Sequence, residues 1–174
     1  MIRRDLLALS EEREIEDKIP KHLPIKVKIK KEKESAVKDL GNEKCMRDFE
    51  LEVNNAGNKP IYFLYIVVEM PEIRAPNGTI ISFPLVYGRT ELGSIESKAE
   101  PDDIPIKPGE TIVLNAHDGN VRGWDLFRRD HNKPQPKKLA LRFVMLTFGD
   151  GTGFEGVDGH FLPEPPKERS SVER

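Results

Sequence analysis

Three acidic residues interleaved with glycines near the end of the chain are its best candidates for chemistry. Asp150, Glu155 and Asp158 fall within residues 149–159, where a flexible backbone could wrap their oxygen atoms around a hard cation such as Ca²⁺. Their spacing is not that of an EF-hand loop. The alternative is a hairpin, in which Asp150-Gly151 turns the chain after a buried strand and the later glycines relieve crowding or form a bulge. Ca²⁺ is the one cofactor that the sequence suggests, and we otherwise expect none.

The other residue types that act in catalysis or metal binding are dispersed. The histidines lie far apart, and none belongs to an HExxH or HxH arrangement that would set two ligands on one face of an element. Cys45 is the only cysteine, so it can form neither an internal disulfide nor a CxxC site, and we interpret it as a small buried hydrophobe. The sequence contains no Gly-x-Ser-x-Gly nucleophile elbow and no phosphate-binding P-loop. The sequence therefore predicts a protein that is not an enzyme.

Two aromatic residues are candidates for contact with a ligand or partner, because a flat ring can stack on a sugar or on a basic group. Trp124 lies in a segment with helical character, where Val121, Trp124 and Phe127 recur every three residues. Its alternative role is to anchor that helix to a sheet. Phe154 could close one end of the domain while its loop carries a surface for a partner.

Charge and hydropathy limit the kinds of partner. Lys and Arg number 28 against 30 Asp and Glu, a formal net charge of −2, so no global basic field favours nucleic acid. The lysines of residues 26–33 could bind polyanions, but Glu32 and Glu34 dilute them. No run approaches the roughly 18 apolar residues of a membrane-spanning helix, and the opening residues lack the apolar core of an export signal. We expect a protein partner, no nucleic acid and no membrane insertion, and the sequence leaves the oligomeric state open.

Segments in which apolar and polar residues alternate indicate that β-strands position these side chains. Residues 25–30 place β-branched side chains on one face and lysines on the other, and residues 49–53 do the same with glutamates. If these two strands pair, the lysines lie opposite Asp48, Glu50 and Glu52. Residues 61–68 are apolar on both faces and are the best candidate for a central strand. Further strands are expected at residues 79–86, 111–116 and 139–148. These six segments indicate a sandwich of six or seven strands, about seven.

The segments between these strands contain turn formers and two helical patterns. Residues 54–60 form a turn with a glycine, Gly57, that is able to take positive φ. Residues 32–44 are highly charged with apolar residues at near-helical spacing, which indicates a short helix or a loop. Residues 119–130 form the second helical pattern, and prolines that follow it end the helix.

One domain is the expected organisation, because 174 residues can bury a core without metals or disulfides. Residues 1–18 are expected to be an N-terminal extension with room for a short helix, residues 19–162 the folded domain, and residues 163–174 a disordered tail rich in proline and charge. The dispersed glycines and prolines favour many short strands joined by turns. The predicted fold class is an all-β antiparallel sandwich with one or two short helices.

Two phrases of the sequence resemble bacterial immunoglobulin-like modules. Phe49-Glu-Leu-Glu-Val-Asn-Asn-Ala-Gly-Asn-Lys-Pro-Ile61 resembles the second strand, turn and third strand of such modules, and Ile106-Lys-Pro-Gly-Glu-Thr-Ile-Val-Leu114 resembles the entry into a later strand. The chain is also similar to a group of uncharacterised bacterial proteins in Ile19-Pro-Lys-His-Leu-Pro-Ile-Lys-Val-Lys-Ile29 and in Phe148-Gly-Asp-Gly-Thr-Gly-Phe154. This resemblance covers residues 14–163 and implies an immunoglobulin-like sandwich and an extracytoplasmic location, but no specific activity.

Three classes of function are consistent with these observations. The leading hypothesis is a non-catalytic structural or protein-interaction module that presents loops or a sheet edge to a partner. The alternative is a carbohydrate- or calcium-binding module that uses residues 149–159. An enzyme would require a concave pocket with convergent titratable residues, which the sequence does not predict.

Overall fold

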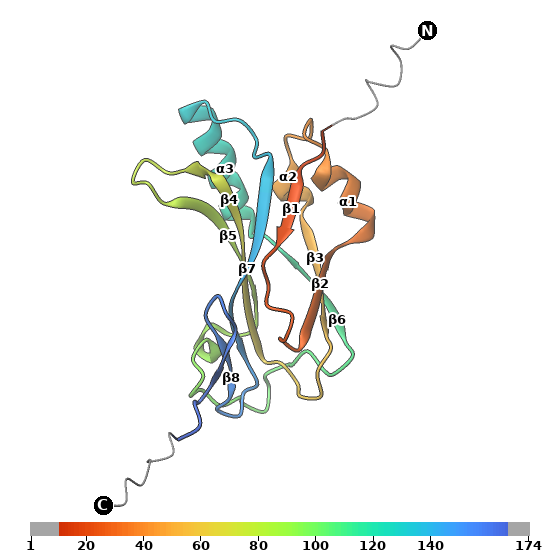
Figure 1. Cartoon of the computed structure of the whole chain (residues 1–174), viewed down its shortest axis with the longest axis vertical. Helices are drawn as coiled ribbons and strands as arrows, with labels where there is room; N and C mark the ends of the chain where they lie inside the picture. Colours follow the sequence, from red (N-terminus) through yellow and green to blue (C-terminus); the bar gives the residue numbers. More distant parts are fainter. Residues whose placement is uncertain (1–10, 167–174) are drawn as a thin grey trace, which may run out of the picture.

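Two β-sheets packed on each other make up most of the protein (Figure 1). The structure is a computed structural model that describes residues 11–166. The larger sheet contains β1 (Glu14–Asp17), β4 (Phe63–Arg74), β5 (Ile80–Tyr87), β7 (Lys138–Thr147), β8 (Gly153–Glu155) and β9 (His160–Leu162), and the smaller contains β2 (Ile25–Ile29), β3 (Glu50–Asn55) and β6 (Thr111–Asn115). The predicted all-β sandwich is confirmed. Most of the tail expected at residues 163–174 lies outside the described residues.

The order of strands in the larger sheet is β5-β4-β7-β8-β9, and in the smaller sheet it is β2-β3-β6. Strands pair antiparallel throughout, except that β1 runs parallel to β7, with Glu14 opposite Lys138 and Asp17 opposite Leu141. The folded domain therefore begins before residue 19, where the sequence pattern indicated only an extension. β1 is too short to show alternation over several residues, and its pairing with β7 is what makes it a strand.

The strands expected at residues 25–30, 49–53, 61–68, 79–86, 111–116 and 139–148 are all present, as β2 to β7 in chain order. β4 is apolar on both faces because it is a central strand, with β5 on one side and β7 on the other. β8 and β9 are additions to the prediction and have three residues each. Strands of this length carry too little pattern to be recognised.

The helices are α1 (Lys31–Lys38), α2 (Cys45–Asp48) and α3 (Asp118–His131), with a 3-10 turn, η1 (Thr90–Leu92). The helix expected at residues 119–130 is confirmed as α3, which begins where the His117 ring accepts a hydrogen bond from the Gly119 N–H and ends at Asn132 in the left-handed region. α1 confirms the first helical pattern. No helix within residues 11–166 is long and apolar enough to cross a membrane.

The core lies between the two sheets and is closed by the helices. Leu51 and Val53 of β3 belong to one buried cluster with Ile66 and Val68 of β4, and all four side chains are fully buried. Val37 from α1, Met46 from α2 and both Val121 and Trp124 from α3 belong to the same cluster. The helices are thus part of the core and not appendages to the sandwich.

The lysines of β2 pair with the glutamates of β3, as the sequence predicts. The two strands are antiparallel, with Lys28 opposite Glu52, and the two charges lie 3.4 Å apart. Lys30 forms the next ion pair, in which its Nζ lies 3.2 Å from Oε2 of Glu50. Pairs of this kind contribute roughly 0.2–1 kcal/mol each on an exposed sheet face.

Candidate functional site

β1 and β2 stand at the open side of the sandwich, one from each sheet (Figure 1). β1 pairs with β7 alone and β2 pairs with β3 alone, so each strand has one edge on which no described residue pairs. A free edge leaves backbone N–H and C=O groups available to another chain. Ile15 of β1 and Ile29 of β2 line the same pocket.

Two pockets are lined by residues of β2 and by none of β3, the strand that pairs with it. The first, of about 460 Å³, is lined by Ile15 of β1, Lys28 and Ile29 of β2, and Lys31, Glu34 and Lys38 of α1. The second, of about 340 Å³, takes Ile25, Lys26 and Val27 from β2 and adds Asp17, Ile19 and Lys21 among others. Every residue of β2 therefore lines one pocket or the other. We call this pair of pockets the edge groove.

The floor of the edge groove is apolar. Val27 and Ile29 point to the core side of β2, opposite Val53 and Leu51 of β3. Val53 and Leu51 are fully buried, whereas Val27 and Ile29 are only half-buried. The difference arises because β3 has a neighbour on both edges and β2 has one on a single edge. A flank of apolar side chain therefore remains exposed in the groove.

The rim of the edge groove is basic, since five lysines and two acidic residues line its two pockets. Lys38 is engaged, because its hydrogen bond with Glu34 of 2.7 Å raises the pKa of Lys38 and lowers the pKa of Glu34. Lys26 and Lys31 are exposed and form no ion pair with any residue from 11 to 166. These two charges are the ones left for a partner.

The predicted Ca²⁺ ligands do not form a metal site. Asp150 accepts hydrogen bonds from Lys59 Nζ at 2.5 Å and from the hydroxyl of Thr152. Partial loss of water raises the pKa of Asp150, but these hydrogen bonds outweigh that effect and lower it to about 2. Glu155 lies in β8 and Asp158 in the turn after it, both exposed. In the part of the chain that the structure describes, no three His, Cys, Asp or Glu side chains gather as metal ligands would.

The hairpin interpretation of the same segment is confirmed. β7 and β8 pair antiparallel, with Thr147 opposite Gly153, and the turn between them contains Gly149 and Gly151 at φ of 67° and 89°. Gly153 has a different function, because a Cβ there would lie 2.2 Å from the carbonyl oxygen of Leu146. The glycines of this segment therefore allow the tight turn and the close approach of the two strands.

Trp124 is an anchor of α3 and not an exposed platform. Its side chain is 4% exposed, its ring meets Phe83 of β5 edge-on at 6.3 Å, and it stacks on Phe127 at 5.9 Å. Its indole N–H is buried and has no hydrogen-bond acceptor among the described residues. This packing against Phe83 and Phe127 favours the role of helix anchor for Trp124 over that of a stacking surface for a sugar or a partner.

Phe154 belongs to β8, which lies at the end of the sandwich away from α3 (Figure 1). Its ring is half-buried and meets Phe148 at 6.1 Å and Phe161 at 5.2 Å, both edge-on. Phe161 of β9 is 46% exposed. Phe154 thus packs against the core, and Phe161 covers its outer side.

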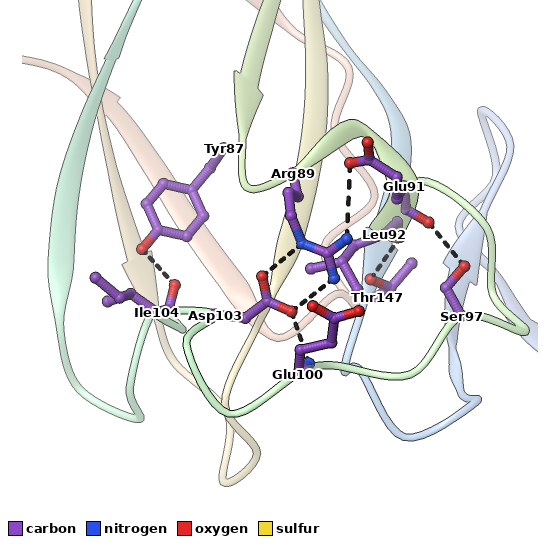
Figure 2. A network of polar contacts seen from close by, with 9 residues as sticks. All are labelled: Tyr87, Arg89, Glu91, Leu92, Ser97, Glu100, Asp103, Ile104 and Thr147. Atoms are coloured by element: carbon purple, nitrogen blue, oxygen red, sulfur yellow. Dashed lines mark hydrogen bonds and ion pairs between the residues drawn. The ribbon is translucent and has the colours of Figure 1, made fainter.

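A network of polar contacts fixes the long connection between β5 and β6 (Figure 2). The Arg89 guanidinium donates to both carboxylate oxygens of Asp103, at 2.7 and 2.8 Å, and the Glu100 N–H donates to the same carboxylate. The guanidinium and this N–H lower the pKa of Asp103 to about 2, and the pKa of Arg89 is raised. Tyr87 donates to the Ile104 carbonyl beside them. These groups neutralise one another, so the network is a clamp on the backbone.

Sequence reasoning misses the edge groove and the clamp for the same reason. Arg89 and Asp103 are 14 residues apart, and no spacing rule connects them. The groove depends on which strand edge is left free. The alternation of apolar and polar residues along a strand does not determine which strands are its neighbours. The cluster of lysines at residues 26–33 is the one sequence signal that points to it.

Comparison of the chain with models of protein families, with curated proteins and with solved structures found no match. The resemblance to bacterial immunoglobulin-like modules stays a prediction.

Proposed function

We propose that this protein is a non-catalytic interaction module that binds a segment of a protein partner in the edge groove. The observation that carries the proposal is the free edge of β2, where backbone groups that no residue from 11 to 166 pairs with adjoin the half-buried side chains of Val27 and Ile29. Strand addition to an exposed sheet edge is a common way for a sandwich to bind a peptide.

The chemistry of the ionisable groups favours binding over catalysis. The carboxyls with strongly lowered pKa, Asp103 and Asp150, are held by Arg89 and Lys59. A catalytic carboxyl would instead be placed in a cavity with room for substrate. The residues that line the edge groove are apolar or lysine for the most part, with no histidine or cysteine among those the structure assigns to it. Such a lining suits recognition of a chain by shape and charge.

The alternative module, for carbohydrate or calcium, receives less support. Trp124 is buried, so the ring with the largest flat face is not available to stack on a sugar. Asp150 is occupied by Lys59 and Thr152, and Glu155 and Asp158 lie elsewhere along the hairpin. The edge groove therefore remains the surface best suited to a ligand.

The proposal can be tested by photo-cross-linking in extracts of the source cells. A photoreactive residue would replace Lys21, whose side chain is 82% exposed at the edge groove and whose ion pair with Asp17 is worth little. The matched control replaces Lys133, an exposed lysine beyond α3. We expect a covalent adduct with a discrete protein from position 21 and none from position 133. No adduct at position 21, or equal adducts at both positions, would overturn the proposal.

A further inference from the structure

We infer that the segment bound in the edge groove is an extended strand in which acidic and apolar residues alternate, and that it pairs antiparallel with the free edge of β2. This inference rests on the proposed function and names the chemistry of the partner. β2 already holds a strand of this chemistry, β3, on its opposite edge.

β3 is a strand of this kind. Its residues Glu50-Leu51-Glu52-Val53 alternate between acidic and apolar, and β2 meets them with lysines on the outer face and apolar residues on the core face. Lys28 pairs with Glu52, and Val27 faces Val53. Because side chains of a strand stand nearly perpendicular to the sheet, the two faces of β2 are presented equally to a neighbour on either edge. The free edge of β2 therefore repeats the pattern that receives β3.

The charge at the free edge calls for acidic partners. Lys26 lies opposite Asn54 of β3, which carries no charge, and Lys31 follows β2 at the start of α1. Neither lysine forms an ion pair within residues 11–166, and the lining of the groove has more lysines than acids. Glutamate or aspartate on the outer face of an added strand would pair with Lys26, as Glu52 does with Lys28. Lys31 is the second lysine that lines the groove without an ion pair to a described residue.

The apolar floor distinguishes a peptide from a simple polyanion. Val27 and Ile29 keep an exposed flank, and Ile15 of β1 lies across the groove from Ile29. A nucleic acid or a sulfated polysaccharide would meet the lysines but would leave these side chains uncovered. A strand with apolar residues at every second position covers them and bonds to the backbone of β2 at the same time. Alternation, and not charge alone, is therefore the property to test.

The probe is a blocked peptide in which glutamate and valine alternate over the length of β2. Three comparison probes separate the contributions: the same peptide with glutamine in place of glutamate, a peptide with all glutamates before all valines, and a heparin oligosaccharide. Binding is measured by isothermal titration at low and at physiological salt, because screening weakens exposed charge pairs. We expect the alternating peptide to bind at least about tenfold more tightly than each of the others.

Variants of the protein test whether the peptide binds in the edge groove. Lys26→Glu with Lys31→Glu should weaken the alternating peptide by about tenfold or more, whereas Lys133→Glu, an exposed control, should leave it unchanged. All three side chains are exposed, so thermal unfolding is expected to show folded proteins.

Equal binding of the block peptide or of heparin would overturn the inference in favour of a general polyanion. If the chain alone sediments as a dimer and no peptide binds, a second copy fills the groove and the inference is wrong. If position 21 still cross-links a protein but the alternating peptide does not bind, the proposed function stands and the inference alone fails.

Discussion

Val27 and Val53 face each other across the β2–β3 pair, but Val53 is fully buried whereas Val27 is half-buried. The two residues are chemically identical, so the difference comes from strand order alone. β3 lies between β2 and β6, and β2 is the outer strand of the smaller sheet. The apolar flank that this position exposes is the floor of the edge groove.

The same asymmetry predicts unequal losses of stability. Val53→Ala should lower the free energy of unfolding by about 2 kcal/mol, because it removes buried methyl groups and leaves a cavity. Val27→Ala should cost about 1 kcal/mol, since part of the side chain is in water already. Urea unfolding of both variants measures the difference. Equal losses would mean that the exposed flank of Val27 is covered in solution.

Trp124 should tolerate replacement by a smaller aromatic ring without an N–H, but not the loss of an aromatic ring. Trp124→Phe is expected to cost about 1 kcal/mol, because removing a buried N–H that has no acceptor among residues 11–166 offsets part of the lost contact. Trp124→Ala should cost about 3–5 kcal/mol, since it empties the site between Phe83 and Phe127. Denaturant unfolding compares the two variants. A loss in Trp124→Phe as large as in Trp124→Ala would contradict this prediction.

The clamp between Arg89 and Asp103 should make stability depend on acid pH. The folded pKa of Asp103 is about 2 against an ordinary value of 3.8, so below the ordinary value the unfolded chain binds more protons than the folded one. The stabilisation is therefore complete above about pH 4 and is lost as the pH falls toward 2. Asp150 acts in the same direction.

Asp103→Asn isolates the contribution of the clamp. This variant should be less stable than the wild type at neutral pH, and the difference between them should shrink as the pH falls below 4. Thermal unfolding from pH 7 to pH 2 measures both curves. A difference that stays constant over this range would contradict a lowered pKa for Asp103.

Two glycines in different surroundings should respond in opposite directions to alanine. A Cβ at Gly153 would lie 2.2 Å from the Leu146 carbonyl oxygen of the neighbouring strand, so Gly153→Ala should destabilise the fold by about 2 kcal/mol or more. Gly123 lies inside α3 with nothing within 4 Å of its Cβ position. Gly123→Ala should stabilise by up to about 1 kcal/mol, because alanine favours a helix. The midpoint of thermal unfolding checks both signs, and two shifts in the same direction would contradict them.

The alternation of apolar and polar residues predicts only those strands that are long enough to contain the pattern more than once. β2 to β7 each show an apolar face or two apolar faces, whereas β1, β8 and β9 have three or four residues and owe their conformation to the neighbours they pair with. The lysines of β2 and the glutamates of β3 could be paired from the sequence because each face is a simple stripe. Which edge of β2 stays open could not, since it depends on a fold in which β1 joins the other sheet.

The turn at Gly57 is predicted correctly, but the physical reason for glycine there differs from the predicted one. The residue lies in the turn between β3 and β4, as expected, but it is not among the glycines with positive φ. A Cβ at this position would lie 2.7 Å from the Cβ of Pro24. Space, and not backbone conformation, therefore excludes a larger residue. Pro24 precedes β2, and no local rule connects it with residue 57.

Hydrogen exchange on β2 tests the central claim most directly. In the free protein, the β2 amides that point away from β3 should exchange rapidly, because no described residue accepts from them. With the alternating glutamate–valine peptide in excess, these amides should become protected, while those at the free edge of β5, the outer strand of the larger sheet, should not change. Protection at β5 and not at β2, or no protection at either edge, would contradict the account.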